Sequence, residues 1–125
     1  MPELAEVAYA CGQWNLGIGK FVKEVYTNPN SRVFRELSRK QVISELSGAM
    51  LSSSATHGKQ MLFKFSGNRW LGLHLGMTGS LHTENSSYKH CKQDALILFQ
   101  SKQTLIFRDP RQFGRLRLHT GKEAP

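Results

Sequence analysis

Cysteine is scarce in this sequence. Only Cys11 and Cys91 occur among the 125 residues, and neither belongs to a Cys-x-x-Cys pair. This excludes a zinc finger within the chain and argues against a disulfide scaffold. A domain of this size buries roughly two thirds of the surface that its unfolded chain exposes, so a hydrophobic core suffices to stabilise it. The cysteine content therefore favours a reducing, intracellular environment.

Long apolar runs are also missing. No apolar stretch approaches the ~18 residues that a membrane helix needs, and the N-terminus begins with Glu3 and Glu6 rather than with basic residues. The sequence thus predicts neither a signal peptide nor a membrane span. We expect a soluble, cytoplasmic protein that does not bind a membrane.

Acidic residues are few, and this is the first positive indication of function. The chain has 9 Asp and Glu against 17 Lys and Arg, which gives a net charge of +8. Residues 51–125 hold 11 of the basic and 4 of the acidic side chains. A field of this sign favours a polyanionic partner, and nucleic acid fits better than a membrane surface because no basic amphipathic helix occurs in this part. Charge retained for solubility is the alternative.

Two helices are predicted from the spacing of apolar residues. The first covers residues 2–15, where apolar side chains recur at steps of three and four. The second is short: it follows the capping pattern Ser38-Arg39-Lys40-Gln41 and ends at Gly48.

After Gly48 the period of the pattern changes from that of a helix to that of a strand. About seven short antiparallel strands are predicted over the chain, at 21–26, 61–65, 70–75, around Leu81, and at 95–99, 104–107 and 115–119, with a polar loop at 83–93. The predicted fold is mainly β with two helices (α+β): a two-sheet antiparallel β-sandwich with an N-terminal helix and a second short helix at its edge. No repeat or internal domain boundary is visible.

Metal and nucleotide sites are not indicated. The five histidines include no His-x-x-x-His pair, so we expect no metal site. The segments Gly17-Ile18-Gly19 and Gly76-Met77-Thr78-Gly79 lack the strand, glycine and helix context of a phosphate loop and are interpreted as turns.

The N-terminus offers amine chemistry. Pro2 is a small residue of the kind after which the initiator methionine is normally removed, which would expose a secondary amine. An α-amino group titrates near 7.7–8.0, so a useful fraction is unprotonated at neutral pH and can attack an aldehyde. The resulting iminium has a fixed positive charge that favours elimination at the neighbouring carbon, and Glu3 is placed to move protons. Alternatively, Pro2 and Glu3 are simply suited to the first turn of a helix.

Four motifs carry a family resemblance. They are Met1-Pro2-Glu3-Leu4-Ala5-Glu6-Val7, Gly58-Lys59 before a strand, His74-Leu75-Gly76-Met77-Thr78-Gly79-Ser80-Leu81 followed by Lys89-His90, and Asp109-Pro110-Arg111-Gln112-Phe113-Gly114. In this order they closely resemble the N-terminal domain of the formamidopyrimidine-DNA glycosylase and endonuclease VIII family, and more closely the formamidopyrimidine branch. The resemblance covers residues 1–118, which we take as the domain, and leaves 119–125 as a short tail.

The resemblance implies a DNA glycosylase/AP lyase of base-excision repair that removes oxidised purines such as 8-oxoguanine and formamidopyrimidines, with β-elimination at the abasic site. Pro2 would be the Schiff-base nucleophile on the sugar C1′, and Glu3 the acid/base that assists ring opening and base release. Lys59 would contact the phosphate of the lesion and assist elimination. The implied partner is damaged double-stranded DNA, bound by a monomer, which places the protein at the nucleoid of a bacterial-type cytoplasm.

The resemblance also implies DNA-contacting residues. His74, His90 and Arg111 fall at positions that contact phosphates or lie near the lesion. Met77, Arg111 and Phe113 correspond to the side chains that fill the duplex where the damaged nucleotide has been flipped out. On pattern alone, Lys59 is an ordinary exposed cation, Met77 a core residue, and Phe113 an aromatic residue at the sandwich edge.

The sequence departs from the family pattern in several places. Ala5 replaces a proline, Ala8 an acid, Lys92 a histidine, and Gln112 an arginine. The helical DNA-binding region and zinc finger that follow in the family are not in this sequence, so no cofactor is expected in this chain. The alternative to an enzyme is a non-catalytic DNA-binding or damage-sensing β domain with the same fold.

Overall fold

The computed structural model describes residues 4–35 and 37–125; the predicted catalytic pair Pro2 and Glu3 lies outside this part. The elements follow in the order α1 (Leu4–Asn15), β1 (Val22–Thr27), the 3-10 helix η1 (Arg32–Phe34), α2 (Arg39–Leu46), β2 (Leu51–His57), β3 (Gln60–Phe65), β4 (Arg69–His74), β5 (Ser80–Asn85), β6 (Asp94–Gln100), β7 (Gln103–Arg108) and β8 (Arg115–Thr120). No helix among the described residues is long and apolar enough to cross a membrane.

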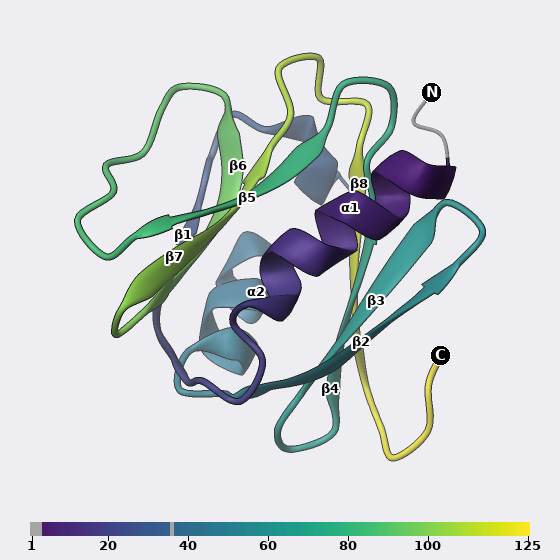
Figure 1. Ribbon diagram of the computed structural model, residues 1–125, viewed down its shortest axis with the longest axis vertical. Coiled ribbons are helices and arrows are strands. Elements are labelled where there is room, and N and C mark those ends of the chain that lie inside the picture. The colour runs from purple at the N-terminus through teal and green to yellow at the C-terminus, as the bar shows by residue number, and fades with distance from the viewer. Residues whose placement is uncertain (1–3, 36) are drawn as a thin grey trace.

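The strands form two four-stranded antiparallel sheets (Figure 1). One has the order β1-β6-β7-β5 and the other the order β2-β3-β4-β8. The predicted fold class, a two-sheet antiparallel sandwich with an N-terminal helix and a second short helix, is confirmed.

The helices close the two open sides of the sandwich. α1 packs on β5, the last strand of one sheet, and on β2 and β3 of the other. On the opposite side α2 packs on β1, and η1 packs on β8. Each helix therefore covers strand edges that otherwise expose apolar side chains to water.

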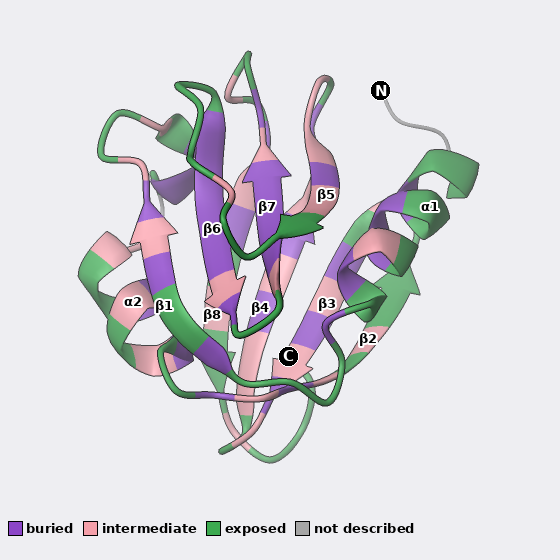
Figure 2. Ribbon diagram, turned by 60° about the vertical axis from the view of Figure 1, so that its left-hand side comes forward, coloured by how far each residue is buried: buried purple, intermediate pink, exposed green. Residues whose placement is uncertain are grey.

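The core joins both sheets to α1 through Trp14. This side chain is fully buried; its ring centroid lies 5.0 Å from that of Phe63 on β3, and its Nε1–H donates to the carbonyl oxygen of Ile106 on β7 at 3.2 Å. A buried indole needs such a partner, because an unpaired N–H in an apolar core costs free energy. Figure 2 shows the buried residues gathered where the strands face one another and along the inner side of α1.

The capping prediction for the second helix is confirmed. Ser38 takes the N-cap position, and its Oγ accepts a hydrogen bond from the backbone N–H of Gln41 at 3.3 Å. Gly48 follows the helix with a φ of +81°, a conformation that glycine adopts without strain.

Two strand predictions were wrong in detail. β2 was missed, so the described residues form eight strands where about seven were predicted. Its sequence Leu-Ser-Ser-Ser-Ala-Thr-His has only its first residue buried, because β2 is an edge strand and need not alternate apolar with polar residues. The loop predicted at 83–93 begins later, because β5 continues through Asn85, whose Cα pairs with that of Gln103. Backbone pairing with β7 holds this polar segment in the sheet.

Candidate nucleic-acid interface

Two loops at one end of the sandwich form the centre of the candidate site. The first joins β4 to β5 and carries Met77; the second, residues 109–114, joins β7 to β8 and carries Arg111 and Phe113. They lie side by side at the top of Figure 1, near the N-terminal end of α1. Ala5 of α1 lines a pocket of about 350 Å³ together with Leu75 and Gly79 of the first loop.

Gly76 allows the two loops to touch. Its φ is +68°, and a Cβ at this position would lie 2.6 Å from both the backbone nitrogen of Gly114 and the carbonyl carbon of Phe113. Real Cβ atoms do not approach backbone so closely, so only glycine fits here. The close approach brings Met77, the next residue, alongside the second loop.

Asp109 fixes the second loop from inside. Its side chain is buried, with only 2% of the residue surface exposed. One carboxylate oxygen accepts from the Thr78 hydroxyl at 2.9 Å, and the other accepts from the backbone N–H of Gly114 at 2.7 Å. The carboxylate therefore binds both loops, a role that the sequence analysis did not assign to it.

The side chains predicted to enter the duplex are presented at the surface. Met77 is 52% exposed and Phe113 is 48% exposed, which excludes the core position considered for Met77. The Arg111 guanidinium carbon lies 5.0 Å from the ring centroid of Phe113, within the range of a cation–π contact. The structure thus brings all three residues to one edge.

Gln112 has a structural role in this loop. It has a φ of +61°, and its side-chain Oε1 accepts from the backbone N–H of Arg32 in η1 at 3.1 Å. This contact joins the loop to η1. The arginine expected from the family pattern has no acceptor oxygen and would not make this bond.

His74 ends β4 beside these loops, with its tautomer set by a hydrogen bond. Its Nδ1 accepts from the backbone N–H of Gly76 at 3.0 Å, so the proton of the neutral ring lies on Nε2. Burial, and then the positive charges of Arg115 and Lys59, lower the pKa of His74 below its ordinary 6.5. At neutral pH the ring is uncharged and presents one N–H donor, which suits a phosphate oxygen.

Lys59 lies close enough to His74 to lower its pKa, and the strand register explains this proximity. Lys59 sits in the turn between β2 and β3, and the next residue, Gln60, pairs with His74. Lys59, predicted to contact the phosphate of the lesion, and His74, predicted to contact phosphates or lie near the lesion, are therefore neighbours at one corner of the sheet.

His90 lies apart from that corner. Its ring stacks on Tyr26 of β1 with a centroid separation of 4.5 Å, and it lines a pocket of about 500 Å³ together with Pro110 and Gln112. His74 lines a different pocket. The structure therefore does not bring the two predicted histidines into one site; it places them in pockets that both border the 109–114 loop.

An ion pair between a buried carboxylate and a half-buried arginine holds the segment that carries His90. Asp94 is fully buried and accepts from Arg108 Nε at 2.9 Å, from the Tyr88 hydroxyl at 2.6 Å and from the backbone N–H of Cys91 at 2.7 Å. Burial opposes ionisation of this carboxyl, but the three donors together hold its pKa below the ordinary 3.8. Sequence reasoning missed this network, because its members look like ordinary loop and strand residues.

No three His, Cys, Asp or Glu side chains in residues 4–35 and 37–125 are grouped so that they could hold a metal ion. The fold and the site define a class: a basic two-sheet sandwich with an N-terminal helix, from which two interlocked loops project a methionine, an arginine and a phenylalanine.

The chain belongs to the formamidopyrimidine-DNA glycosylase family, since the model of that family's N-terminal domain matches residues 1–116. A formamidopyrimidine-DNA glycosylase of Roseiflexus is 32% identical over 120 residues, and one of Idiomarina loihiensis is 34% identical over 120 residues. These matches cover 94% and 93% of this chain but only 44% and 42% of the relatives. The chain thus spans less than half the length of these proteins.

Solved structures agree with this assignment. A structure of MutM in complex with DNA containing carbocyclic 8-oxo-G superposes with a TM-score of 0.85 at 26% identity, covering 95% of this chain and 45% of that one. The Lactococcus lactis formamidopyrimidine-DNA glycosylase, bound to DNA with an AP site, has the same fold, with a TM-score of 0.85 at 24% identity and coverage of 95% and 45%.

Proposed function

We propose that this chain is the nucleophile-bearing and duplex-filling part of a DNA glycosylase/AP lyase that excises oxidised purines from double-stranded DNA. The observation that carries the proposal is the pair of interlocked loops that project Met77, Arg111 and Phe113 from one basic edge. An extruded nucleotide leaves a hole in the stack, and exposed apolar and guanidinium groups fill such a hole.

The proposed chemistry begins with Pro2. Its secondary amine attacks the sugar C1′ and loses its proton, the C1′–base bond breaks, and the base leaves with a proton that Glu3 helps to supply. The C1′–O4′ bond of the sugar ring then breaks, O4′ takes a proton that Glu3 also helps to supply, and the nitrogen lone pair forms the C1′ iminium. The resulting iminium acidifies the C2′ proton, so a base removes it and the C3′–O bond breaks with the 3′ phosphate as leaving group. Water then hydrolyses the iminium and restores the amine.

The described residues support the binding side of this proposal. Lys59 and the Nε2–H of His74 lie at one corner, suited to the phosphate of the extruded nucleotide. The 3′ phosphate becomes the leaving group during elimination, so a nearby cation stabilises the negative charge that develops on it. These groups border the loop next to the first turn of α1, the helix that Pro2 and Glu3 directly precede in sequence.

Borohydride trapping on a duplex with an abasic site tests the proposal, because reduction converts the iminium into a stable amine. Intact mass of the free protein shows whether Met1 is removed and the amine is available. We would test this chain alone and joined to the remaining region of the Roseiflexus relative. We expect a covalent adduct that disappears in Pro2→Gly.

The results for the chain alone and for the chain joined to the remaining region are interpreted together. An adduct in either form, lost in Pro2→Gly, supports the proposal. If DNA binds and neither correctly processed form gives an adduct, the catalytic function is overturned, and the chain is a DNA-binding or damage-sensing domain. Glu3→Gln separates the two steps: we expect it to retain adduct formation on a preformed abasic site and to lose release of an oxidised base.

A further inference from the structure

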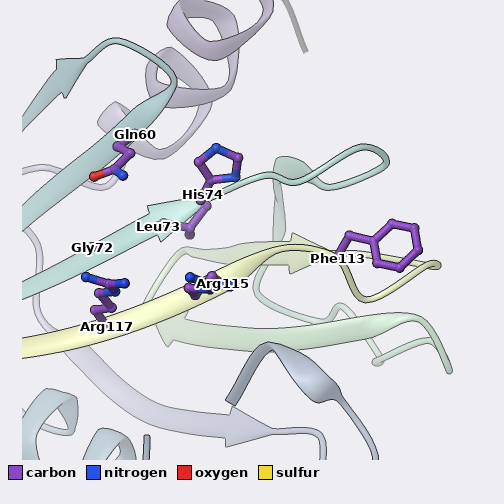
Figure 3. Close-up of a pocket in the computed structure, with 7 residues that line it drawn as sticks. All are labelled: Gln60, Gly72, Leu73, His74, Phe113, Arg115 and Arg117. Carbon is purple, nitrogen blue, oxygen red and sulfur yellow. The ribbon is translucent and has the colours of Figure 1, made fainter. Parts of the chain in front are cut away.

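A groove lies on the outer face of β3, β4 and β8, beside the 109–114 loop. Its volume is about 330 Å³; its ionisable lining residues are His74, Arg115 and Arg117, and none of its lining residues is acidic. Figure 3 shows Arg117 and Arg115 in succession along β8, with His74 on the neighbouring strand and Phe113 beyond Arg115. The groove therefore extends from the duplex-filling edge along the sheet.

The strand register explains why these cations share one face. Arg115 pairs with His74, and Arg117 pairs with Gly72. Directly opposite residues of an antiparallel pair point to the same side, and Leu116 between the arginines is buried in the core. The two arginines are separated by about 6.7 Å along the strand, comparable with the separation of successive phosphates along a nucleic-acid strand.

Gly72 forms the floor of the groove. A Cβ there would lie 3.7 Å from the Arg117 Cβ, an ordinary contact, so the backbone does not require glycine. The missing side chain leaves the sheet surface open between Gln60 and Arg117. This hollow gives a ligand access to the arginines from the side.

The whole sheet is free of acidic residues. Strands β2, β3, β4 and β8 contain no Asp or Glu, whereas β1, β5 and β6 of the other sheet contain Glu24, Glu84 and Asp94. The groove therefore lies on the more positive of the two sheets, and its field attracts polyanions.

We propose that this groove binds the sugar-phosphate backbone of a DNA strand, with Arg115 and Arg117 contacting successive phosphates beyond those expected at Lys59 and His74. The inference rests on the proposed function, which supplies DNA as the partner. A guanidinium fork matches two phosphate oxygens, and two arginines line the groove. Contacts of this kind hold the duplex in register without reading its sequence.

The salt dependence of DNA binding tests the groove. We would measure the affinity of the full chain for labelled duplexes, undamaged and with an abasic-site analogue, at several salt concentrations. Each phosphate contact contributes about 0.9 to the slope of log K against log salt concentration. We expect Arg115→Gln and Arg117→Gln each to reduce the slope by about 0.9, equally on both duplexes, and the double variant to reduce it by twice that amount.

Two further variants distinguish DNA binding in the groove from a general effect of the positive charge of the protein. Lys102→Gln removes one exposed cation from the turn between β6 and β7, away from the groove, and should leave the slope nearly unchanged. Gly72→Val changes no charge but fills the groove floor, and should weaken binding as the arginine variants do. Thermal melting of each variant shows that the fold is intact.

The outcomes distinguish this inference from the proposed function. Suppose that the wild-type chain binds both duplexes and that the folded arginine variants show the same slope of log K against log salt concentration as the wild-type chain. The groove then does not contact DNA, and this inference alone is overturned. Lys102→Gln is expected to keep the wild-type slope in either case. If the wild-type chain binds neither duplex, either alone or joined to the remaining region of the Roseiflexus relative, DNA is not its partner and both proposals fall. Reduced slopes in the arginine variants, with weaker binding in Gly72→Val, support the groove.

Discussion

The Thr78 hydroxyl donates a hydrogen bond to the buried carboxylate of Asp109 at 2.9 Å. This contact joins the loop that carries Met77 to the loop that carries Arg111 and Phe113. The same carboxylate accepts from the Gly114 N–H, so one side chain fixes both loops. Three exposed side chains that are proposed to enter a duplex together thereby share one rigid support.

The first prediction concerns the hydrogen bonds by which Asp109 connects the two loops. Asp109→Ala should lower the free energy of unfolding by about 2 kcal/mol, because it removes two hydrogen bonds to a buried charge. Thr78→Val keeps the shape and leaves the bond from Gly114 in place; it removes the bond to Asp109 and the longer, more exposed one from the Arg111 N–H at 3.3 Å, so its loss should be smaller than that of Asp109→Ala. Urea denaturation measures both. Equal stability of Asp109→Ala and the wild-type chain would show that the carboxylate does not hold the loops.

A second prediction separates function from stability at the duplex-filling edge. Met77→Ala and Phe113→Ala should change the free energy of unfolding by less than about 0.5 kcal/mol, since both side chains are half exposed. They should nevertheless reduce the fluorescence increase of a 2-aminopurine placed opposite an abasic-site analogue, which reports unstacking. Leu16→Ala, at a 57% exposed residue following α1, is the matched control and should leave the fluorescence unchanged. An equal loss in the control would contradict this assignment.

The third prediction concerns the ion pair behind His90. Arg108→Met leaves the Asp94 carboxylate buried without its cation, and should cost about 2 to 3 kcal/mol of stability. Arg69→Met is the control, because it removes a half-exposed pair with Glu45 that is worth about 1 kcal/mol or less. Denaturant titration at neutral pH compares the two. A cost no larger in Arg108→Met than in Arg69→Met would refute the prediction.

Acid should remove the contribution of Asp94. The folded state holds the pKa of this carboxyl below 3.8, so the carboxylate stabilises the fold above the unfolded pKa of about 3.9. This stabilisation is lost as the pH falls through the lower folded value. Asp94→Asn lacks this titration, so its stability deficit relative to the wild-type chain should shrink between about pH 5 and pH 2. A deficit that is constant over this range would contradict the assigned shift.

The fifth prediction concerns His74. Its pKa, followed by the ring proton signals in NMR spectra, should lie below 6.5 and should rise in Arg115→Gln, because one of the cations that disfavour the charged ring is removed. An unchanged His74 titration in this variant would show that Arg115 does not act on the ring.

Much of the fold follows from local patterns, and the misses have physical reasons. The apolar spacing of α1 predicted that Val7, Cys11 and Trp14 are buried, and they are. It was wrong for Leu4 and Ala8, which are exposed near the start of the helix. Ser38 marked the start of α2. β2 was missed because only its pairing with β3 makes it a strand. Its polar side chains remain in water whether or not the strand forms.

The candidate site was also predicted only in part from the sequence. The motifs around Met77 and Phe113 were visible as strings, and the resemblance gave them a role before any geometry was known. Nothing in the string showed that Asp109 is buried beneath them, that Gln112 bonds to Arg32, or that His90 stacks on Tyr26. These contacts join residues far apart in sequence.

The sequence by itself determined the family, the sandwich class and the excess of positive charge, because each is recorded in residue types and in short-range spacing. Only the tertiary structure decided where that charge acts. Pairing of β4 with β8 places Arg115 and Arg117 beside His74 and Gly72, more than 40 residues earlier in the chain. A groove exists only once distant strands are paired in one register, which short-range spacing does not encode.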